Sequence, residues 1–419
     1  MDPKDRRPWP RQPEHVGWSL LHQVSTRALL VIKFFAAARL LGPEAVGLVA
    51  VATLSMAVVE AMTETGLQQA VIQNRKRLDA QEAGALWTLQ LTRGALIFVT
   101  LTLCSGLAAT FFKAPAAAAL VTATAVIAVL RGAVTPGPIL RQRDRDFRST
   151  AFYEVAAGAV DLTTTLALIA AGAGPMAMIA GSTAGEGTKL ALSWLALRAP
   201  LQPNLRWGAI SHLTHYGKWI WGNSVLTLLL NQLDKILVGR YLGIGELGIY
   251  QMAARIGQLL IAEPALAFGQ YLFPTYARLF RASEGEAHRR FLRVLRLCVL
   301  CLLAMAALVL AGSGTLIDLA LGDAWKDTHR LTQLFVFPMA VGALIAMLVP
   351  YLRAIGQPQA ILVATLLQLL ALAAVAPWLL PAHQATGMVL ATGIAGCVSL
   401  AWMLFAAVIR HREHGGARP

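Results

Sequence analysis

Charged side chains lie inside long apolar stretches of this sequence, where each charge facing hydrocarbon would cost about 2.5 to 3.5 kcal/mol. Ten are basic and seven are acidic. The basic ones include Arg39, Lys235, Arg240 and Arg255. Arginine carries a planar fork of donors that matches the oxygens of phosphate and carboxylate groups. We therefore expect these cations to face a polar interior, and their excess over the acids favours an anionic ligand.

Other polar residues share helix faces with these cations. Asn231 precedes Lys235 by four residues, so the two lie on one face of a helix. Gln251, Arg255 and Gln258 form a second stripe of the same kind. We expect the amides to bind hydroxyl groups. The candidate ligand-binding residues are Arg255, Arg39, Arg240, Lys235, Asn231, Gln251 and Gln258.

Acidic residues form a second group of candidates. Glu60 and Glu64 lie one helical turn apart, and Asp234 precedes Lys235 directly. We expect Glu60, Glu64 and Asp234 to carry protons during a transport cycle or to pair with the cations. A structural ion pair is the alternative for Asp234 and Lys235.

Four further cations have a structural interpretation instead. Glu186 and Lys189, spaced three residues apart, are expected to form an ion pair that only stabilises the fold. Arg93, Arg131 and Arg296 are candidates for locking helices together.

The elements that must position these residues are helices that cross a membrane. The sequence is 57% hydrophobic and 14% charged, with a mean hydropathy of +0.59. Soluble domains are about one quarter charged. A bilayer accepts only helices or closed barrels, and runs of about 20 apolar residues indicate helices. We predict an all-α polytopic protein with twelve spans, near 18–41, 46–73, 84–110, 115–140, 150–171, 176–197, 219–240, 248–274, 294–313, 331–352, 358–380 and 386–409.

The formal net charge of +14 is explained by topology. If the N-terminus is cytoplasmic, segments on that side hold 23 Lys and Arg residues and the opposite side holds only Lys113, Lys326 and Arg330. This asymmetry follows the positive-inside rule. It predicts a protein of the plasma membrane with both termini on the cytoplasmic side. We therefore expect contact with membrane lipids and no binding of nucleic acid.

A short motif occurs twice. Arg39-Leu-Leu-Gly-Pro-Glu-Ala-Val-Gly47 and Arg240-Tyr-Leu-Gly-Ile-Gly-Glu-Leu-Gly248 share Arg-x-Leu-Gly, four residues and Gly, and each stands between two spans. The repeat predicts two six-helix lobes related by a pseudo-twofold along the membrane normal, with a ligand site where they face each other. Both motifs read as tight turns at the outer ends of the spans. The predicted divisions are a tail 1–17, a lobe 18–197, a linker 198–218, a lobe 219–410 and a tail 411–419.

Several functions have no support in the sequence. It contains no Gly-x-x-x-x-Gly-Lys-[Ser/Thr] motif for binding a nucleotide, and its loops are too short for a catalytic domain. Cys298 and Cys301 lie in an apolar helix without His or carboxylate companions, which favours packing over metal or redox chemistry. We expect no enzymatic activity, no cofactor and no metal.

The sequence resembles the Wzx-type oligosaccharide flippases, the polysaccharide transporters of the multidrug/oligosaccharidyl-lipid/polysaccharide (MOP) exporter superfamily. The residues that carry the resemblance are Leu41-Gly-Pro-Glu-Ala-Val-Gly-Leu48, Glu64-Thr-Gly-Leu-Gln-Gln-Ala-Val-Ile-Gln73, Asp234-Lys-Ile-Leu-Val-Gly-Arg-Tyr-Leu-Gly243 and Leu247-Gly-Ile-Tyr250. They cover mainly the first, second, seventh and eighth predicted spans. The lipid II flippase branch of the superfamily differs in having two further C-terminal helices.

The resemblance implies a function and partners. Such proteins flip an undecaprenyl-pyrophosphate-linked oligosaccharide repeat unit across the bacterial inner membrane by alternating access, for surface polysaccharide biosynthesis such as lipopolysaccharide or exopolysaccharide. The lipid-linked oligosaccharide and membrane lipids would then be ligands, glycosyltransferases and a polymerase of the same pathway are candidate partners, and we expect a monomer. A cation-coupled small-molecule exporter on the same fold is the first alternative. A membrane-bound polysaccharide polymerase is the second.

Overall fold

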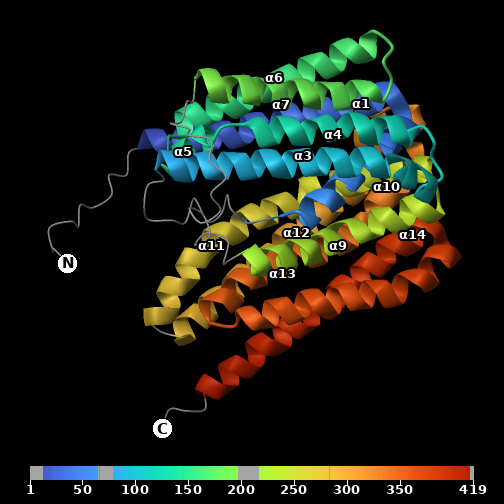
Figure 1. Cartoon of the computed structure of the whole chain (residues 1–419). Helices are drawn as coiled ribbons and strands as arrows, with labels where there is room; N and C mark the ends of the chain where they lie inside the picture. The colour runs from blue at the N-terminus through green and yellow to red at the C-terminus, as the bar shows by residue number, and fades with distance from the viewer. Residues whose placement is uncertain are drawn as a thin grey trace. The chain divides into compact units, whose positions relative to one another are not determined.

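The computed structural model describes residues 13–64, 66, 79–144, 146–196, 217–282 and 284–415. Every regular element in these ranges is a helix, and no strand occurs among them (Figure 1). The predicted all-α polytopic fold is confirmed. By contacts between Cα atoms the chain divides into two compact units. Unit 1 holds the described residues of Met1–Leu41, Val51–Thr110 and Ala114–Ser224; unit 2 holds those of Gly42–Ala50, Phe111–Lys113 and Val225–Pro419.

Unit 1 is built on the helices of the first half of the chain. They are α1 (Pro13–Met62), α3 (Ala80–Phe111), α4 (Ala117–Ala133), α5 (Gly137–Arg143), α6 (Phe147–Ala170) and α7 (Met176–Leu195). The start of α3 is a reciprocal cap, in which the Asp79 amide donates to Glu82 at 3.0 Å and the Glu82 amide donates to Asp79 at 2.7 Å. Asp146 caps α6 by accepting from the Ser149 amide at 3.1 Å. Helices α6 and α7 run side by side (Figure 1).

Unit 2 contains the remaining helices. They are α9 (Gly217–Tyr241), whose first turns belong to unit 1, α10 (Ile244–Gly257), the π-helix η3 (Gln258–Ala262), α11 (Glu263–Ala282), α12 (Glu284–Ala320), the 3₁₀ turn η4 (Asp323–Trp325), α13 (Lys326–Ala354) and α14 (Pro358–Gly415). The segment Gly42–Ala50 of α1 also packs in this unit, although both of its neighbours in the chain pack in unit 1.

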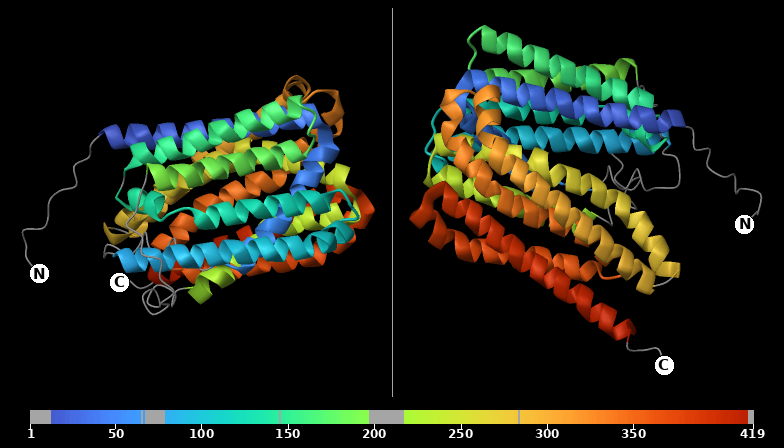
Figure 2. Two further views of the ribbon diagram at one scale, coloured as in Figure 1. Left: turned by 45° about the horizontal axis from the view of Figure 1, so that its top comes forward. Right: turned by 180° about the vertical axis from the view of Figure 1, so that it is seen from behind.

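Two of these helices are broken in the middle. Helix α1 has 50 residues and breaks at Gly42, and α14 has 58 residues and breaks at Gln384. At about 1.5 Å per residue either helix would be more than twice as long as the roughly 30 Å of a bilayer core. Each break therefore yields two arms of spanning length. The arms of α14 fold back on one another (Figure 2), and the Trp402 indole donates to the Ala360 carbonyl at 3.2 Å between them.

Six of the described helices are long and apolar enough to cross a membrane, and α4 with α5, bent by 62°, makes a seventh candidate. Because α1 and α14 each supply two arms, this set provides nine spans, and an arrangement of twelve also needs described helices outside it. Helices α7, α9 and α10 are absent from it. Helix α9 carries Asp234 and α10 carries Arg255, both of the predicted site, and α7 carries Glu186 of the predicted structural ion pair.

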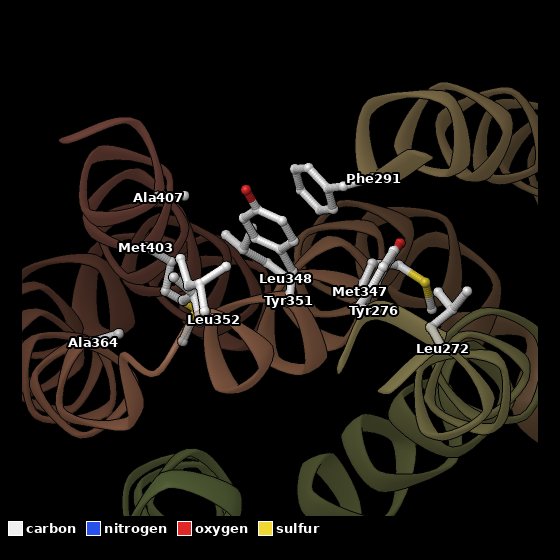
Figure 3. Close-up of a cluster of buried hydrophobic side chains, with 11 residues drawn as sticks. Leu272, Tyr276, Phe291, Met347, Leu348, Tyr351, Leu352, Ala364, Met403 and Ala407 are labelled. Atoms are coloured by element: carbon white, nitrogen blue, oxygen red, sulfur yellow. The ribbon is translucent and has the colours of Figure 1, made fainter. Parts of the chain in front are cut away.

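The core of unit 2 is rich in aromatic rings. Phe291 of α12 stacks on Tyr351 of α13 with centroids 4.1 Å apart, and Tyr276 of α11 meets Tyr351 edge-on at 5.9 Å (Figure 3). Met403 and Ala407 of α14 pack against the same cluster. This core therefore holds α11, α12, α13 and α14 together.

Candidate functional site

The two copies of the repeated motif have the same backbone geometry. Gly42 has φ 79° and ψ 177°, and Gly243 has φ 97° and ψ 178°. A residue with a Cβ atom rarely adopts these angles, so both turns require glycine. The prediction that each motif is a tight turn between two helical segments is confirmed.

The second glycine of each motif packs against the other motif. A Cβ atom at Gly47 would overlap the carbonyl oxygen of Ile244, and a Cβ atom at Gly248 would overlap that of Pro43. Pro43 and Ile244 each follow the first glycine of their motif, so the contact is reciprocal. All four residues belong to unit 2. A local two-fold relation between the two repeats would produce such a pair of contacts through equivalent positions.

The arginines of the repeated motif lie in different surroundings. Arg240, in the last turn of α9, places its Cζ atom 5.4 Å from the centroid of the Phe111 ring, within cation–π distance. Arg39 is exposed and stands three residues before the break in α1. The two residues belong to different units by contact, Arg39 to unit 1 and Arg240 to unit 2.

Asp234 is the most buried acid among the candidates, with 8% of its surface exposed. Its Oδ2 accepts a hydrogen bond from the Tyr250 hydroxyl at 2.9 Å, and its Oδ1 has no hydrogen-bond partner among the described residues. Lys235 instead donates to the Asn231 carbonyl at 2.6 Å and to Gln232 at 3.1 Å. These neighbours in sequence therefore bond to different groups. Tyr250 is a partner that helical spacing alone does not indicate.

Arg255 is held at a distortion of the helix. Its Nη1 donates to Gln258 Oε1 at 3.3 Å and lies 3.7 Å from Glu263 Oε1. The π-helix η3 begins at Gln258, and such wide turns change the direction in which side chains project. The buried Gln251 Oε1, on the same stripe, has no partner in the described part of the chain. The predicted stripe thus contains an arginine with one acidic neighbour and an amide with unused hydrogen-bonding capacity.

In unit 1 two glycines bring α3 and α4 into backbone contact. A Cβ atom at Gly94 would lie 2.5 Å from the Ala128 carbonyl oxygen, and one at Gly132 would lie 2.7 Å from that of Gln90. Arg93 and Arg131 each directly precede one of these glycines. The close crossing of the two helices therefore fixes the backbone positions from which both arginine side chains extend.

Both arginines bond to acids of the predicted coupling group. Arg93 Nη2 lies 3.1 Å from Glu64 Oε2 and also donates to the Glu60 carbonyl at 2.9 Å. Arg131 Nη1 lies 2.9 Å from Glu60 Oε1, and its Nε lies 3.1 Å from Glu186 Oε1. Arg93 and Arg131, which the sequence suggested as helix locks, thus join α3 and α4 to α1 and α7.

The network extends along α6 and α7. Lys189 Nζ lies 3.0 Å from Glu154 Oε2 and 3.8 Å from Glu186 Oε1, so the predicted ion pair between Glu186 and Lys189 is present. Four carboxylates thus face three cations through these contacts. A cavity of about 280 Å³ opens beside the network, lined by Glu60, Glu64, Gln90, Arg93, Gly94, Ile97, Ala128, Arg131 and Gly132.

A second ion pair of unit 1 lies at a close helix contact. Lys33 of α1 is 7% exposed, and its Nζ lies 2.6 Å from Asp161 Oδ1 and 2.8 Å from Ser182 Oγ. A Cβ atom at Gly181 would overlap Thr165 Oγ1, so only glycine allows α7 to approach α6 here. Lys33 and Asp161 were among the charges counted from the sequence, but nothing in their spacing indicated the pair, because 128 residues separate them.

Comparison with known proteins shows which family the chain belongs to. The family described as "Polysaccharide biosynthesis protein" matches residues 36–330, which is more than half of the chain. The chain belongs to this family. The matched residues of this chain, 36–330, include both repeated motifs and all ten predicted site residues. The resemblance to the Wzx-type transporters is confirmed at the level of the family.

Two curated relatives match this chain over most of its length. It is 21% identical over 345 residues to the lipopolysaccharide biosynthesis protein WzxC of Escherichia coli (strain K12), covering 81% of this chain and 67% of that protein. It is 22% identical over 348 residues to the succinoglycan biosynthesis transport protein ExoT of Rhizobium meliloti (strain 1021), covering 82% and 69%.

Solved structures share the fold. The lipid II flippase MurJ in an inward closed conformation gives a TM-score of 0.74 at 12% identity, covering 94% of this chain and 87% of that one. An inward-facing MATE-family multidrug transporter of the MOP superfamily gives 0.68 at 12% identity, covering 94% and 99%. This polysaccharide biosynthesis protein therefore has the fold of MOP-superfamily transporters.

Proposed function

We propose that this protein is a flippase that moves an undecaprenyl-pyrophosphate-linked oligosaccharide repeat unit from the cytoplasmic to the periplasmic leaflet of the bacterial inner membrane by alternating access. The family match over residues 36–330 carries this proposal. The names of WzxC and ExoT, which refer to polysaccharide biosynthesis and transport, support it.

The polar stripe of unit 2 supplies groups for such a cargo. Among the described residues Arg255 has one acidic neighbour, Glu263, at 3.7 Å, a distance that leaves the ion pair loose. A pyrophosphate carries more negative charge than one carboxylate and would compete with Glu263 for the guanidinium. Gln251 and Gln258 on the same stripe offer amide groups to sugar hydroxyls. Arg240, Lys235, Asn231 and Arg39 complete the proposed set.

The acids have a proposed role in coupling. Glu60 and Glu64 are bound to Arg131 and Arg93, and Asp234 is bound to Tyr250. Protonation of Glu60 or Glu64 would weaken its bond to an arginine and loosen the helices that the bond joins. We therefore assign the unit 1 network and Asp234 to coupling, and the unit 2 stripe with Arg39 to cargo.

Replacement of Arg255 by Ala tests the cargo assignment. In cells that depend on this protein for surface polysaccharide, we expect Arg255→Ala to lower export at least about tenfold at unchanged protein level, because a hydrogen-bonded charge pair contributes about 1.5 to 3 kcal/mol. The matched control is Arg296→Ala, which removes an exposed arginine of α12. Normal export by Arg255→Ala would remove this residue from the cargo site.

One observation favours the alternative of a cation-coupled exporter of small molecules. The unit 1 network has four carboxylates, Glu60, Glu64, Glu154 and Glu186, against Arg93, Arg131 and Lys189. Such an excess would suit a cationic solute or ion. Expression of the protein in drug-sensitive cells distinguishes the two functions: increased resistance to cationic drugs without any effect on polysaccharide would favour the exporter.

A further inference from the structure

A small polar cavity lies where α10, α13 and the break in α14 meet within unit 2. Its volume is about 320 Å³, at the lower end of the range for small-molecule sites. Three segments of the chain contribute to it: the first turns of α10 and α13, and the residues around Gln384. The lining residues are Glu246, Ile249, Lys326, Asp327, His329, Arg330, Leu331, Gln384, Ala385 and Thr386. None of the predicted site residues is among them.

Gln384 is in a conformation that glutamine rarely adopts. Its φ is 55° and its ψ is −139°, angles that are unfavourable for any residue with a Cβ atom. Gly387 packs so closely on the Leu379 carbonyl that a Cβ atom there would overlap it, which keeps the turn tight. Glycine at position 384 would remove the strain. Position 384 instead holds a glutamine, which is one of the residues that line the cavity.

The charges around the cavity nearly balance. Burial raises the pKa of the Glu246 carboxyl group, and the nearby charge of Asp327 raises it further. Lys326 and Arg330 supply two positive charges, of which Lys326 pairs with Asp323 at 2.8 Å. His329 is oriented by Ser313, 3.1 Å from its Nδ1. The wall therefore presents both donors and acceptors, with little net charge.

This lining selects a class of ligand. Because Glu246 and Asp327 stand beside Lys326 and Arg330, a free ion of either sign meets repulsion as well as attraction at this wall. A metal ion lacks a ligand set, since no three His, Cys, Asp or Glu side chains in the described ranges are placed to hold one. A neutral molecule with several hydroxyl groups can donate to the carboxylates and accept from the amide and guanidinium.

We propose that this cavity binds one neutral sugar residue. The inference rests on the proposed flippase function and adds to it a subsite apart from the arginine stripe. Lys326 and Arg330, in the first turns of α13, are residues that the charge count assigns to the outer side. A sugar held here would be one that has already crossed the membrane, so the cavity would favour the outward step of the cycle.

Free sugars and the purified full-length protein in detergent test the proposal. Saturation-transfer NMR with galactose, glucose, N-acetylglucosamine and glucuronic acid reports which sugars touch the protein. We expect transfer to at least one of the neutral sugars and little to glucuronic acid. In Gln384→Gly the signal should fall about fivefold, the factor expected for the loss of one hydrogen bond. The melting temperature of Gln384→Gly should stay equal or rise, because strain is relieved.

Gln359→Gly is the matched control, because Gln359 is an exposed glutamine in the first turn of α14 that does not line the cavity. Its transfer signal should match that of the wild type. No transfer to any neutral sugar, or equal transfer in wild type and Gln384→Gly, would overturn the proposal. Flipping of lipid-linked oligosaccharide by the wild type, measured separately, shows whether the flippase function stands when this subsite fails.

Discussion

Gly248 lies directly against Pro43, so closely that a Cβ atom at Gly248 would overlap the Pro43 carbonyl oxygen. The reciprocal contact joins Gly47 to Ile244. Two segments that are about two hundred residues apart in the chain thus pack so closely that their backbone atoms meet.

Alanine at either glycine of this contact tests its importance. We expect Gly47→Ala and Gly248→Ala each to destabilise the protein by about 1 to 3 kcal/mol, because the added methyl group must displace a carbonyl. Thermal unfolding in detergent measures the loss. Gly245→Ala is the control, since a Cβ atom there meets nothing within 4 Å. Equal melting temperatures for all three variants would contradict the close contact.

The Lys33–Asp161 pair predicts a large effect from a single substitution. Lys33→Ala should cost about 3 to 5 kcal/mol, because it leaves Asp161 charged and without its cation at a largely buried position. Arg141→Ala removes an exposed pair, Arg141 with Asp146 at 3.2 Å, and should cost at most about 1 kcal/mol. The double variant Lys33→Met, Asp161→Leu should be more stable than Lys33→Ala. A double variant as unstable as the single one would show that the loss in Lys33→Ala does not come from the unpaired charge of Asp161.

The bond between Tyr250 and Asp234 predicts a rescue. Tyr250→Phe removes the donor and leaves both oxygens of a buried carboxylate without a described partner, which should cost about 1 to 3 kcal/mol. Asp234→Asn removes the charge, so Tyr250→Phe should cost less in that background. A double-mutant cycle on chemical denaturation measures the coupling. Additive losses would show that the two side chains do not interact.

Glu246 predicts a dependence of stability on pH. Burial, and then the charge of Asp327, raise the pKa of Glu246 in the folded protein. The folded state therefore holds the proton more tightly than the unfolded state, whose pKa is about 4.3. The contribution of this group is most favourable below that pH and is lost as pH rises through the raised folded-state pKa. Glu246→Gln should melt at a higher temperature than wild type above that pKa, and the gap should shrink toward pH 4. A gap that does not change with pH would contradict the raised pKa.

Spacing within one helix predicted the local features of this protein. The two Arg-x-Leu-Gly motifs gave the positive-φ turns at Gly42 and Gly243, because a tight turn needs a residue without a Cβ atom. The spacing of Gln251, Arg255 and Gln258 placed them on one stripe, and the bond between Arg255 and Gln258 follows from it.

Partners from different helices could not be predicted in this way. Glu60 bonds to Arg131 across 71 residues, and Lys33 bonds to Asp161 across 128. The sequence shows that such charges must be satisfied in a membrane but does not show by which partner. The glycines at positions 94, 132 and 181 were the available signal, because they mark where helices approach closely enough to bring distant charges together.

Translocation by the purified protein tests the central claim most directly. Proteoliposomes would carry a lipid-linked oligosaccharide labelled on its sugars, and a glycosidase added outside would report the fraction exposed in the outer leaflet. We expect the wild-type protein to expose cargo that empty liposomes keep protected, Arg255→Ala to do so at least about tenfold more slowly, and Arg296→Ala to match the wild type. Equal protection in liposomes with and without the folded protein would contradict the assignment as a flippase.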